Sequence, residues 1–343
     1  MRGKPSSRRF ALLLLLAAGF HASLAGQAAS PGHVVQVGPV VMTVADMSRS
    51  VDFYTRVLTF EKTSDTERSG PEFDRLYGIH DAHIRTVDLR LGDESIELLR
   101  FVGRPGAPVQ PNSRSNDLAF QHVAIIVSDM DAAYGVLRQN HVEQVSSFPQ
   151  TLPAWNPNAA GIKAFYFKDP DGHPLEILQF PPNKGDPKWH SPRGKLFLGI
   201  DHTAIVVSNT DRSLAFYQQA LGMRIAGESE NYGTEQEHLN NVFGAHLRIT
   251  SLRSAEGIGI EFLEYIAPRD SRPASSNAAG TDIGHHETTV VVDDLDAFNT
   301  TLRQMHFLSG SLKPIALSGL VSSTSKAELV RDPDGHFLLA IQR

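Results

Sequence analysis

The histidines and glutamates of this chain are its main candidates for chemistry, because it has no cysteine. Any bound metal ion would be held by nitrogen and oxygen, and imidazole and carboxylate groups suit divalent Zn, Ni, Mn or Fe. His122 and His202 each precede the last valine of a similar apolar segment by five residues, and two similar segments, Leu-Glu-Ile-Leu and Ile-Glu-Phe-Leu, contain Glu176 and Glu261. One histidine beginning a buried strand is usually structural. Two at matching positions, each with a matching glutamate, favour metal binding.

The strands that carry these histidines belong to a set of four. Their last valines lie 83, 80 and 85 residues apart, at Val44, Val127, Val207 and Val292. Such regular spacing indicates an internal repeat of about one module in length. A polar cap, a helical pattern and then β-branched segments follow these strands, so we expect one strand, one helix and three strands per module.

The modules are of two kinds, which alternate along the chain. The first and third share a helical pattern that contains Phe-Tyr, at residues 48–54 and 211–217. The second and fourth share the sequence Asp-Pro-Asp-Gly-His, at residues 169–173 and 332–336. We interpret Asp-Pro-Asp-Gly as a turn between hairpin strands, since these residues favour tight turns. The order A, B, A′, B′ indicates that a two-module unit was duplicated whole.

The repeat predicts two domains of similar length. Modules one and two occupy residues 34–180, and modules three and four occupy residues 198–343, with a proline-rich connector at 181–197. A second connector, at 268–280, separates modules three and four. Connectors do not decide which modules pair, so the pairing stays open at this point.

The module pattern, the Phe-Tyr pairs and the Asp-Pro-Asp-Gly turns before a final Leu-Glu resemble the vicinal-oxygen-chelate superfamily of glyoxalases, bleomycin-resistance proteins and extradiol dioxygenases. The resemblance covers residues 34–343. It implies an α+β fold in which four βαβββ modules pair into two cupped mixed sheets. It also implies one divalent metal ion in a cup, held by a histidine from the first strand and a glutamate from the last strand of each paired module, with open positions for a substrate's two neighbouring oxygens.

Carried over to this chain, the resemblance places the first-strand positions at Pro39, His122, His202 and Glu287, and the last-strand positions at Glu97, Glu176, Glu261 and Leu339. Pairing of neighbouring modules would give two incomplete sites. Pairing of modules two and three would assemble a complete metal set from His122, Glu176, His202 and Glu261. We favour the second pairing, because it leaves one degenerate site instead of two damaged ones.

Other polar and aromatic residues compete for a role. A bulge could bring His286, beside His285, into the ligand position, although the gapless alignment argues against it. Glu264 is expected on the opposite face of its strand from Glu261. The polar stretch 230–238 either contacts substrate or is a solvated loop, and packing is favoured over pocket lining for Trp155 and for Trp189 with His190.

The resemblance implies three kinds of function. A glyoxalase-like lyase or isomerase would work by metal-assisted proton transfer, with Glu176 or Glu261 as the base. An extradiol-type dioxygenase needs two histidines and one carboxylate around Fe(II), which the same residues supply. A small-molecule binding or resistance protein would use the cup without chemistry. We favour the first, acting on a small oxygenated molecule.

The first 25 residues have the pattern of a secretory signal peptide. Four basic residues precede an apolar run at 10–20, and small residues follow, which favours cleavage after Ala25. A membrane anchor is less favoured, because the run is too short to cross ~30 Å of hydrocarbon. We expect a periplasmic or secreted protein, by the general or the twin-arginine route. Cleavage removes those four positive charges and no negative ones, so the formal charge falls from −6 to −10. Nucleic acid is thus an unfavourable partner, and the oligomeric state stays open.

Overall fold

The computed structural model describes residues 32–274, 278–307, 314–317 and 325–342. The signal peptide predicted at residues 1–25 lies outside them. In the described part, modules one and two contain all the expected elements and a few short additional ones. Module one consists of β1 (Val34–Thr43), α1 (Met47–Arg56), β2 (Glu61–Lys62), β3 (Thr66–Ser69), α2 (Pro71–Tyr77), β4 (His83–Leu91) and β5 (Glu94–Phe101). Module two consists of β6 (Phe120–Val127), α3 (Met130–Gln139), β7 (Glu143–Gln144), β8 (Gln150–Thr151), β9 (Lys163–Lys168) and β10 (Pro174–Gln179).

The second half repeats this plan, after a short 3₁₀ turn at Pro187–His190. Module three consists of β11 (Phe197–Val206), α4 (Thr210–Leu214) with a π-helical extension (Ala215–Ala220), β12 (Arg224–Tyr232), α5 (Thr234–Asn240), β13 (His246–Arg253), β14 (Glu256–Gly257) and β15 (Gly259–Ala267). Module four consists of β16 (His286–Val292), α6 (Leu295–Gln304), β17 (Ile315–Leu317), β18 (Ser325–Arg331) and β19 (Phe337–Gln342).

The first helix of every module starts at the polar cap that the repeat predicts. An aspartate or asparagine side chain accepts hydrogen bonds from backbone N–H groups of the first turn, which have no partner inside the helix. The caps are Asp46, Asp129, Asn209 and Asp294. No helix in the described part of the chain is long and apolar enough to span a membrane.

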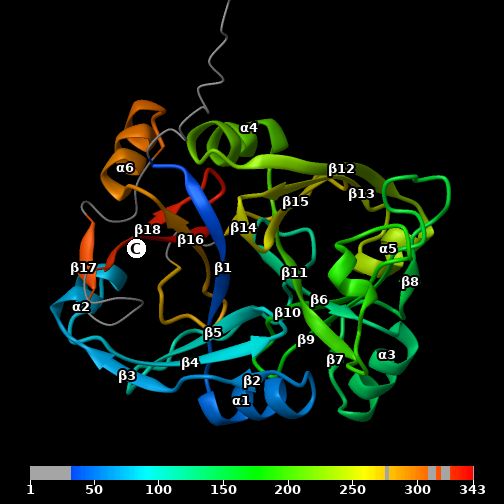
Figure 1. The fold of residues 1–343 in the computed structure, drawn as a ribbon, viewed down its shortest axis with the longest axis horizontal. Coiled ribbons are helices and arrows are strands. Elements are labelled where there is room, and N and C mark those ends of the chain that lie inside the picture. Colours follow the sequence, from blue (N-terminus) through cyan, green and yellow to red (C-terminus); the bar gives the residue numbers. More distant parts are fainter. Residues whose placement is uncertain (1–31, 275–277, 308–313, 318–324, 343) are drawn as a thin grey trace, which may run out of the picture. The chain divides into compact units, whose positions relative to one another are not determined.

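The strands form two mixed sheets, each built mainly from two modules, and the short β14 of module three pairs with β1 of the other sheet (Figure 1). One sheet has the order β17-β18-β19-β16-β1-β5-β4-β2, which joins modules four and one through the antiparallel pair β1 and β16. The other has the order β12-β13-β15-β11-β6-β10-β9-β7, which joins modules three and two through the antiparallel pair β11 and β6. The α+β architecture is thus as expected, and the favoured pairing of modules two and three is the one observed. The predicted domains, residues 34–180 and 198–343, are the two halves of the sequence and do not coincide with the two sheets. Each sheet contains one module from each half.

The motifs that distinguish odd and even modules bind each other. The Tyr54 hydroxyl donates to Asp169 (3.1 Å), and the Tyr217 hydroxyl donates to Asp332 (3.1 Å). The next aspartate of the first turn, Asp171, accepts from the backbone N–H of Ala45. The Asp-Pro-Asp-Gly segments are therefore turns, as expected, and they also fix each even module to the helix of the odd module before it. Figure 1 shows α1 and α4 at opposite ends of the boundary between the two sheets.

Two tight turns connect the sheets directly. Gly257, at φ +85°, lies where an added Cβ would be 1.9 Å from the Val37 carbonyl oxygen. Gly92, at φ +65°, lies where a Cβ would be 2.4 Å from the Leu198 carbonyl oxygen. Only glycine fits this close approach in the left-handed region. Each sheet thus receives a turn from the other at the start of a central strand.

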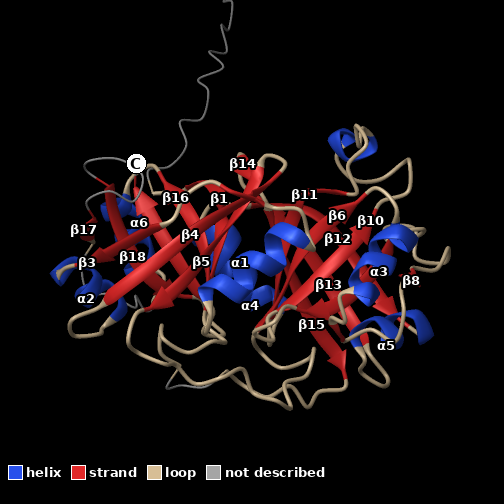
Figure 2. Cartoon of the chain, turned by 90° about the horizontal axis from the view of Figure 1, so that it is seen from below, coloured by secondary structure: helices blue, strands red, loops and turns tan. Residues whose placement is uncertain are grey.

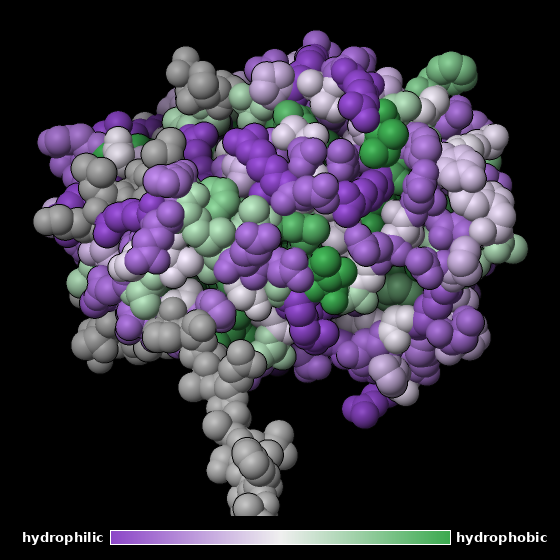
Figure 3. Space-filling view, turned by 90° about the horizontal axis from the view of Figure 1, so that it is seen from above, coloured by the Kyte–Doolittle hydropathy of each residue, from purple (hydrophilic) through white to green (hydrophobic). Residues whose placement is uncertain are grey.

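Figure 2 shows helices beside the strands of both sheets, and Figure 3 shows an outer face that is mostly hydrophilic with some apolar side chains. The largest cluster of buried apolar side chains includes Met42, Phe165, Phe216 and Leu338, one from each module. Burial of such side chains contributes roughly 25 cal/mol per Å² of apolar surface. The core therefore holds all four modules together.

Candidate metal centre

The central strands of the second sheet bring the two predicted histidines together. The register of β6 and β11 pairs His122 with Ala204 and His202 with Ala124, so both imidazoles project from adjacent strands. Their Nε2 atoms lie 3.3 Å apart. The parallel neighbour β10 adds Glu176, whose Oε2 lies 3.1 Å from His122 Nε2 and 3.8 Å from His202 Nε2. All three side chains are buried.

Both strands bulge at the residue immediately before the histidine. The ladder between β6 and β11 skips Asp201 on one strand and Gln121 on the other. Side chains of consecutive strand residues normally point to opposite faces, but a bulge re-aims them. The Asp201 carboxylate consequently accepts from His202 Nδ1 at 3.0 Å, and Gln121 Oε1 meets His122 Nδ1. Each Nε2 consequently faces the other histidine and Glu176.

Asp201 is held by two further groups, which orient it toward His202. Arg253 donates to the Asp201 carboxylate at 2.7 Å, and the Trp189 indole donates to it at 3.2 Å. Burial alone would raise the pKa of Asp201, but the hydrogen bonds from His202 and Arg253 hold that pKa well below its ordinary value. Burial likewise disfavours a charged His202, yet Glu261, Asp201 and Glu176 raise its pKa to about 9.

Glu261 lies beside this group and not within it. Its Oε1 is 3.6 Å from His202 Nε2, and its other oxygen accepts from the Ser251 hydroxyl at 2.8 Å. The group of ligand atoms that all lie within 4.8 Å of one another contains His122, Glu176 and His202 only, among the described residues. The structure therefore places all four predicted residues at one site, as a compact set of three with a fourth carboxylate beside it.

The three-residue group fits a divalent cation. Glu176 Oε2 is buried and has no hydrogen-bond partner, although it faces two imidazole nitrogens. A buried carboxylate oxygen without a partner is costly, and a cation between the three groups would satisfy it. Two imidazoles and one carboxylate match the preferences of Zn, Ni, Mn and Fe.

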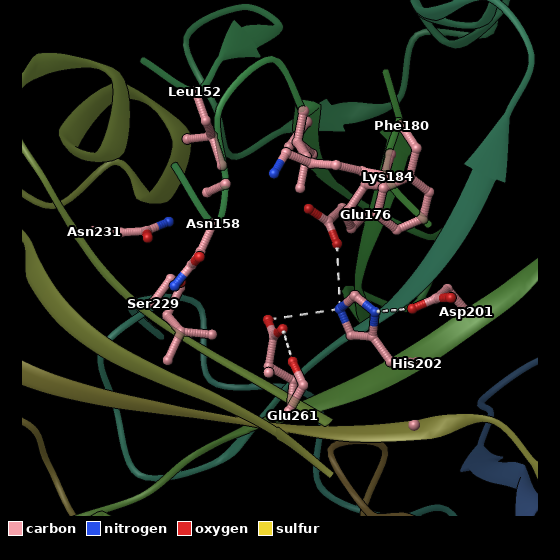
Figure 4. Close-up of a pocket in the computed structure, with 18 of the residues that line it drawn as sticks. Leu152, Asn158, Glu176, Phe180, Lys184, Asp201, His202, Ser229, Asn231 and Glu261 are labelled. Carbon is pink, nitrogen blue, oxygen red and sulfur yellow. Dashed lines mark hydrogen bonds and ion pairs between the residues drawn. The ribbon is translucent and has the colours of Figure 1, made fainter. Parts of the chain in front are cut away.

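A cavity of about 390 Å³ opens onto Glu176, His202 and Glu261 (Figure 4). Glu176 and Glu261 flank His202 on two sides, and Asp201 lies behind the ring. The polar stretch 230–238 does contribute to the wall, through Asn231 and Gln236. A small molecule in the cavity would thus contact both carboxylates and the cation position.

The corresponding positions of the other sheet form no such group. Glu97 and Glu287 both pair with Val41 on β1, from its two sides. Burial and the nearby Asp88 and Glu287 carboxylates raise the pKa of Glu97 to about 8. An apolar cluster that includes Phe73 and Leu76 of α2 packs on this face. This cup is therefore filled, as a degenerate site would be.

The competing residues have other partners. His286 stacks on Phe120, with ring centroids 4.1 Å apart, and its Nδ1 hydrogen-bonds to Gly284 O. Glu264 accepts from the Thr210 backbone at a helix start. Both tryptophans pack, as favoured: Trp189 is buried and also donates to Asp201, and Trp155, although 48% exposed, lies on Tyr232 with ring centroids 4.3 Å apart.

Comparison with known proteins agrees with this architecture. Residues 33–177 and 199–338 match the family model of the Glyoxalase/Bleomycin resistance protein/Dioxygenase superfamily. The chain belongs to this superfamily. One relative, a 2-epi-5-epi-valiolone epimerase from Actinomyces sp, is 32% identical over 157 residues, which are 44% of this chain and 82% of that protein.

The solved structures of a glyoxalase and a candidate dioxygenase share the fold over nearly the whole chain. Glyoxalase I from Zea mays is similar with a TM-score of 0.58 and 16% identity, covering 90% of this chain and 92% of that one. A candidate dioxygenase from Bacillus subtilis gives a TM-score of 0.55 and 13% identity, covering 90% and 86%. At such low identity these similarities establish the fold alone. The chemistry depends on the residues that line the cup of this chain.

Sequence patterns did not identify the residues that orient the two histidines of the predicted metal site. Asp201 and Gln121 directly precede the two histidines, which was the one available signal. In a regular strand that position faces away from the next residue. Only the paired bulges make it a supporting position. Arg253 and the amides of 231 and 236 carry no sequence signal of their own.

Proposed function

We propose that this protein is a divalent-metal-dependent isomerase of the epimerase type. The observation that carries the proposal is the unpartnered Glu176 Oε2 between His122 Nε2 and His202 Nε2. The 32% identical epimerase supports an isomerase-type reaction. The substrate class is a small ketone with an oxygen on the neighbouring carbon. A bound divalent cation would polarise the carbonyl and thereby acidify the adjacent C–H.

Glu261 is the base in this proposal. It stays outside the three-residue group, lines the cavity and is oriented by Ser251. A carboxylate positioned against the acidified C–H removes the proton as a general base. Glu176 flanks His202 on the other side (Figure 4). Addition of a proton from solvent water to the opposite face of the carbon would invert its configuration.

Exchange of substrate hydrogen with solvent tests this proposal. Metal-loaded protein is incubated with hydroxyacetone in D₂O, and deuterium incorporation is followed by NMR. We expect exchange to fall about 100-fold or more in Glu261→Gln, as is typical when a general base is lost, with the metal content unchanged. Exchange that is absent in the wild type, or equal in both proteins, would refute the proposal.

An extradiol-type dioxygenase is the second candidate, favoured by one observation. Two histidines and one carboxylate, His122, His202 and Glu176, form the compact group, and this is the ligand set of non-haem Fe(II) oxygenases. Oxygen uptake by the Fe(II)-loaded protein with a panel of catechols separates the two functions. A non-catalytic binding protein would show neither exchange nor uptake, and its ligand would be recovered unchanged.

We also propose export, on the sequence of residues 1–25 alone. N-terminal sequencing of the mature protein from its native host is expected to start at Gly26. A mature chain that still begins with residues 1–25 would contradict this.

A further inference from the structure

The cavity wall that faces the predicted metal ligands carries uncharged polar groups beside apolar ones such as Leu152. Asn158, Ser229 and Asn231 line one side of the cavity, and Glu176 and His202 lie on the other (Figure 4). Amide and hydroxyl groups each offer both donors and acceptors. Such a wall suits substrate hydroxyl groups, which also donate and accept.

A chain of side-chain hydrogen bonds fixes the orientation of this wall. Asn156 Nδ2 donates to Asn231 Oδ1 at 2.7 Å, and Asn231 Nδ2 donates to Gln236 Oε1 at 3.0 Å. Gln236 donates to Asn240, which donates to the Tyr265 hydroxyl at 2.6 Å. The four amides are buried and all donate in one direction. Asn231 still keeps one N–H and one lone pair for a ligand, in an orientation that does not have to be acquired on binding.

The loop that carries Asn158 is hydrogen-bonded to β12, the strand that carries Ser229 and Asn231. Asn158 Nδ2 donates to the Glu228 carbonyl at 2.7 Å, and Asn156 Nδ2 also lies 3.2 Å from the Glu230 carbonyl. The amide oxygen of Asn158 is thereby left as an acceptor at the cavity. Ser229 adds a hydroxyl from β12, between these two anchors. Three neutral hydrogen-bonding side chains thus occupy one side of a cavity whose other side holds the carboxylates.

The charges of the cavity lining argue against an anionic substrate. Four carboxylates, Glu176, Asp201, Glu228 and Glu261, and two basic side chains, Lys184 and Arg253, line the cavity, and Glu228 also contacts Arg248 outside it. Arg253 is paired with Asp201, and Lys184 Nζ donates to the Pro157 carbonyl. A divalent cation would balance the two excess negative charges and leave the cavity near neutral. The carboxylates of the lining therefore outnumber its basic side chains, and Lys184 is the one of these without a carboxylate partner in the described part of the chain.

We infer that the cavity selects an uncharged, polyhydroxylated ketone, whose hydroxyl groups are bound by Asn231, Asn158 and Ser229. The inference rests on the proposed function and adds the substrate class to it. A volume of about 390 Å³ is near the lower end of ligand pockets, which fits a single sugar-sized or cyclitol-sized molecule.

Binding and exchange, measured separately, test the inference. Metal-loaded protein is titrated with a polyhydroxylated cyclohexanone, hydroxyacetone, dihydroxyacetone and dihydroxyacetone phosphate by calorimetry, and each ketone is also followed for deuterium exchange. Wild type is compared with Asn231→Leu and with Asn158→Ala, an exposed position where substitution does not threaten folding. Asn140→Ala, on an exposed helix end, is the control.

We expect the preference for the polyhydroxylated ring over hydroxyacetone to fall about fivefold to tenfold in each wall variant, the effect of one or two neutral hydrogen bonds, and to persist in the control. Dihydroxyacetone phosphate should bind more weakly than dihydroxyacetone. Equal preference in wild type and both wall variants, or tighter binding of the phosphate, would overturn the inference.

Hydroxyacetone exchange without preference for the ring would overturn the substrate class and leave the proposed function standing. Selective binding of the ring, lost in the wall variants but without any exchange, would support the substrate class and refute the isomerase.

Discussion

At the scale of single residues, the site depends on groups that orient the ligands as much as on the ligands themselves. His202 is held by a charged carboxylate, with Arg253 and Trp189 behind it, whereas His122 is held by the neutral amide of Gln121. Partners of this kind fix the tautomer and direction of a ligand imidazole. The two histidines are therefore chemically unequal, although the repeat makes them equivalent in sequence.

The first prediction concerns Asp201. Asp201→Asn removes the negative charge that orients His202 and leaves Arg253 without its ion pair. We expect the affinity for Zn²⁺ to fall about 10- to 100-fold, the usual effect of losing such a partner, in a competition titration with a chelator. Asp211→Asn, which breaks an exposed ion pair with Arg248, should leave the affinity unchanged. Equal affinity of Asp201→Asn and wild type would contradict the orienting role.

The second prediction is a pH dependence of stability. Burial alone would lower the pKa of His173, but its contact with Asp169 raises that pKa to about 9. The stabilisation from the charged ring is therefore complete below pH 6.5 and is lost as the pH rises through about 9. In urea unfolding, the stability difference between wild type and His173→Gln should shrink by about 2 to 3 kcal/mol between pH 6 and pH 10. The exposed control His80→Gln should show no such change, and a constant difference for His173→Gln would refute the assignment.

At the scale of elements, strand register and its interruptions place the chemistry. The bulges at Gln121 and Asp201 turn each supporting side chain toward its histidine. In the other sheet, the ladder between β1 and β16 also skips residues, at Gly38 and Pro39. Pro39 takes the place of the ligand there, and a proline ring offers no donor atom for a metal. Interruptions of the central strand ladder thus occur in both sheets, but only in one of them do they support a predicted metal site.

The third prediction concerns the turns that cross between the sheets. Gly257→Ala would force a Cβ to 1.9 Å from the Val37 carbonyl in the left-handed region, so the turn or β1 must move. We expect a loss of about 2 to 4 kcal/mol in the free energy of unfolding. Gly244→Ala has a similar φ of +71° but no atom within 4 Å of the added Cβ, and should lose only about 1 kcal/mol. Equal losses would show that the approach to Val37 is unimportant.

At the scale of the whole described chain, the pairing of modules explains which ligands are kept. The sheet of modules two and three holds both predicted histidines and two glutamates, whereas in that of modules one and four an apolar cluster packs beside Glu97 and Glu287. The repeat, the module plan and the four site residues were predictable, because strand periodicity and matching positions leave a direct mark on the sequence. Asp201, Arg253 and the amides around Asn231 were not, because bulges and contacts between modules leave none.

Metal content is the measurement that tests the central claim most directly. The chain is purified without chelators and reloaded with Fe, Mn, Ni and Zn in turn, beside His122→Ala, His202→Ala and Glu97→Ala. A site built by modules two and three predicts about one divalent ion per chain, lost in both histidine variants and kept in Glu97→Ala. No bound ion under any condition, or an ion that survives both histidine substitutions, would contradict the account.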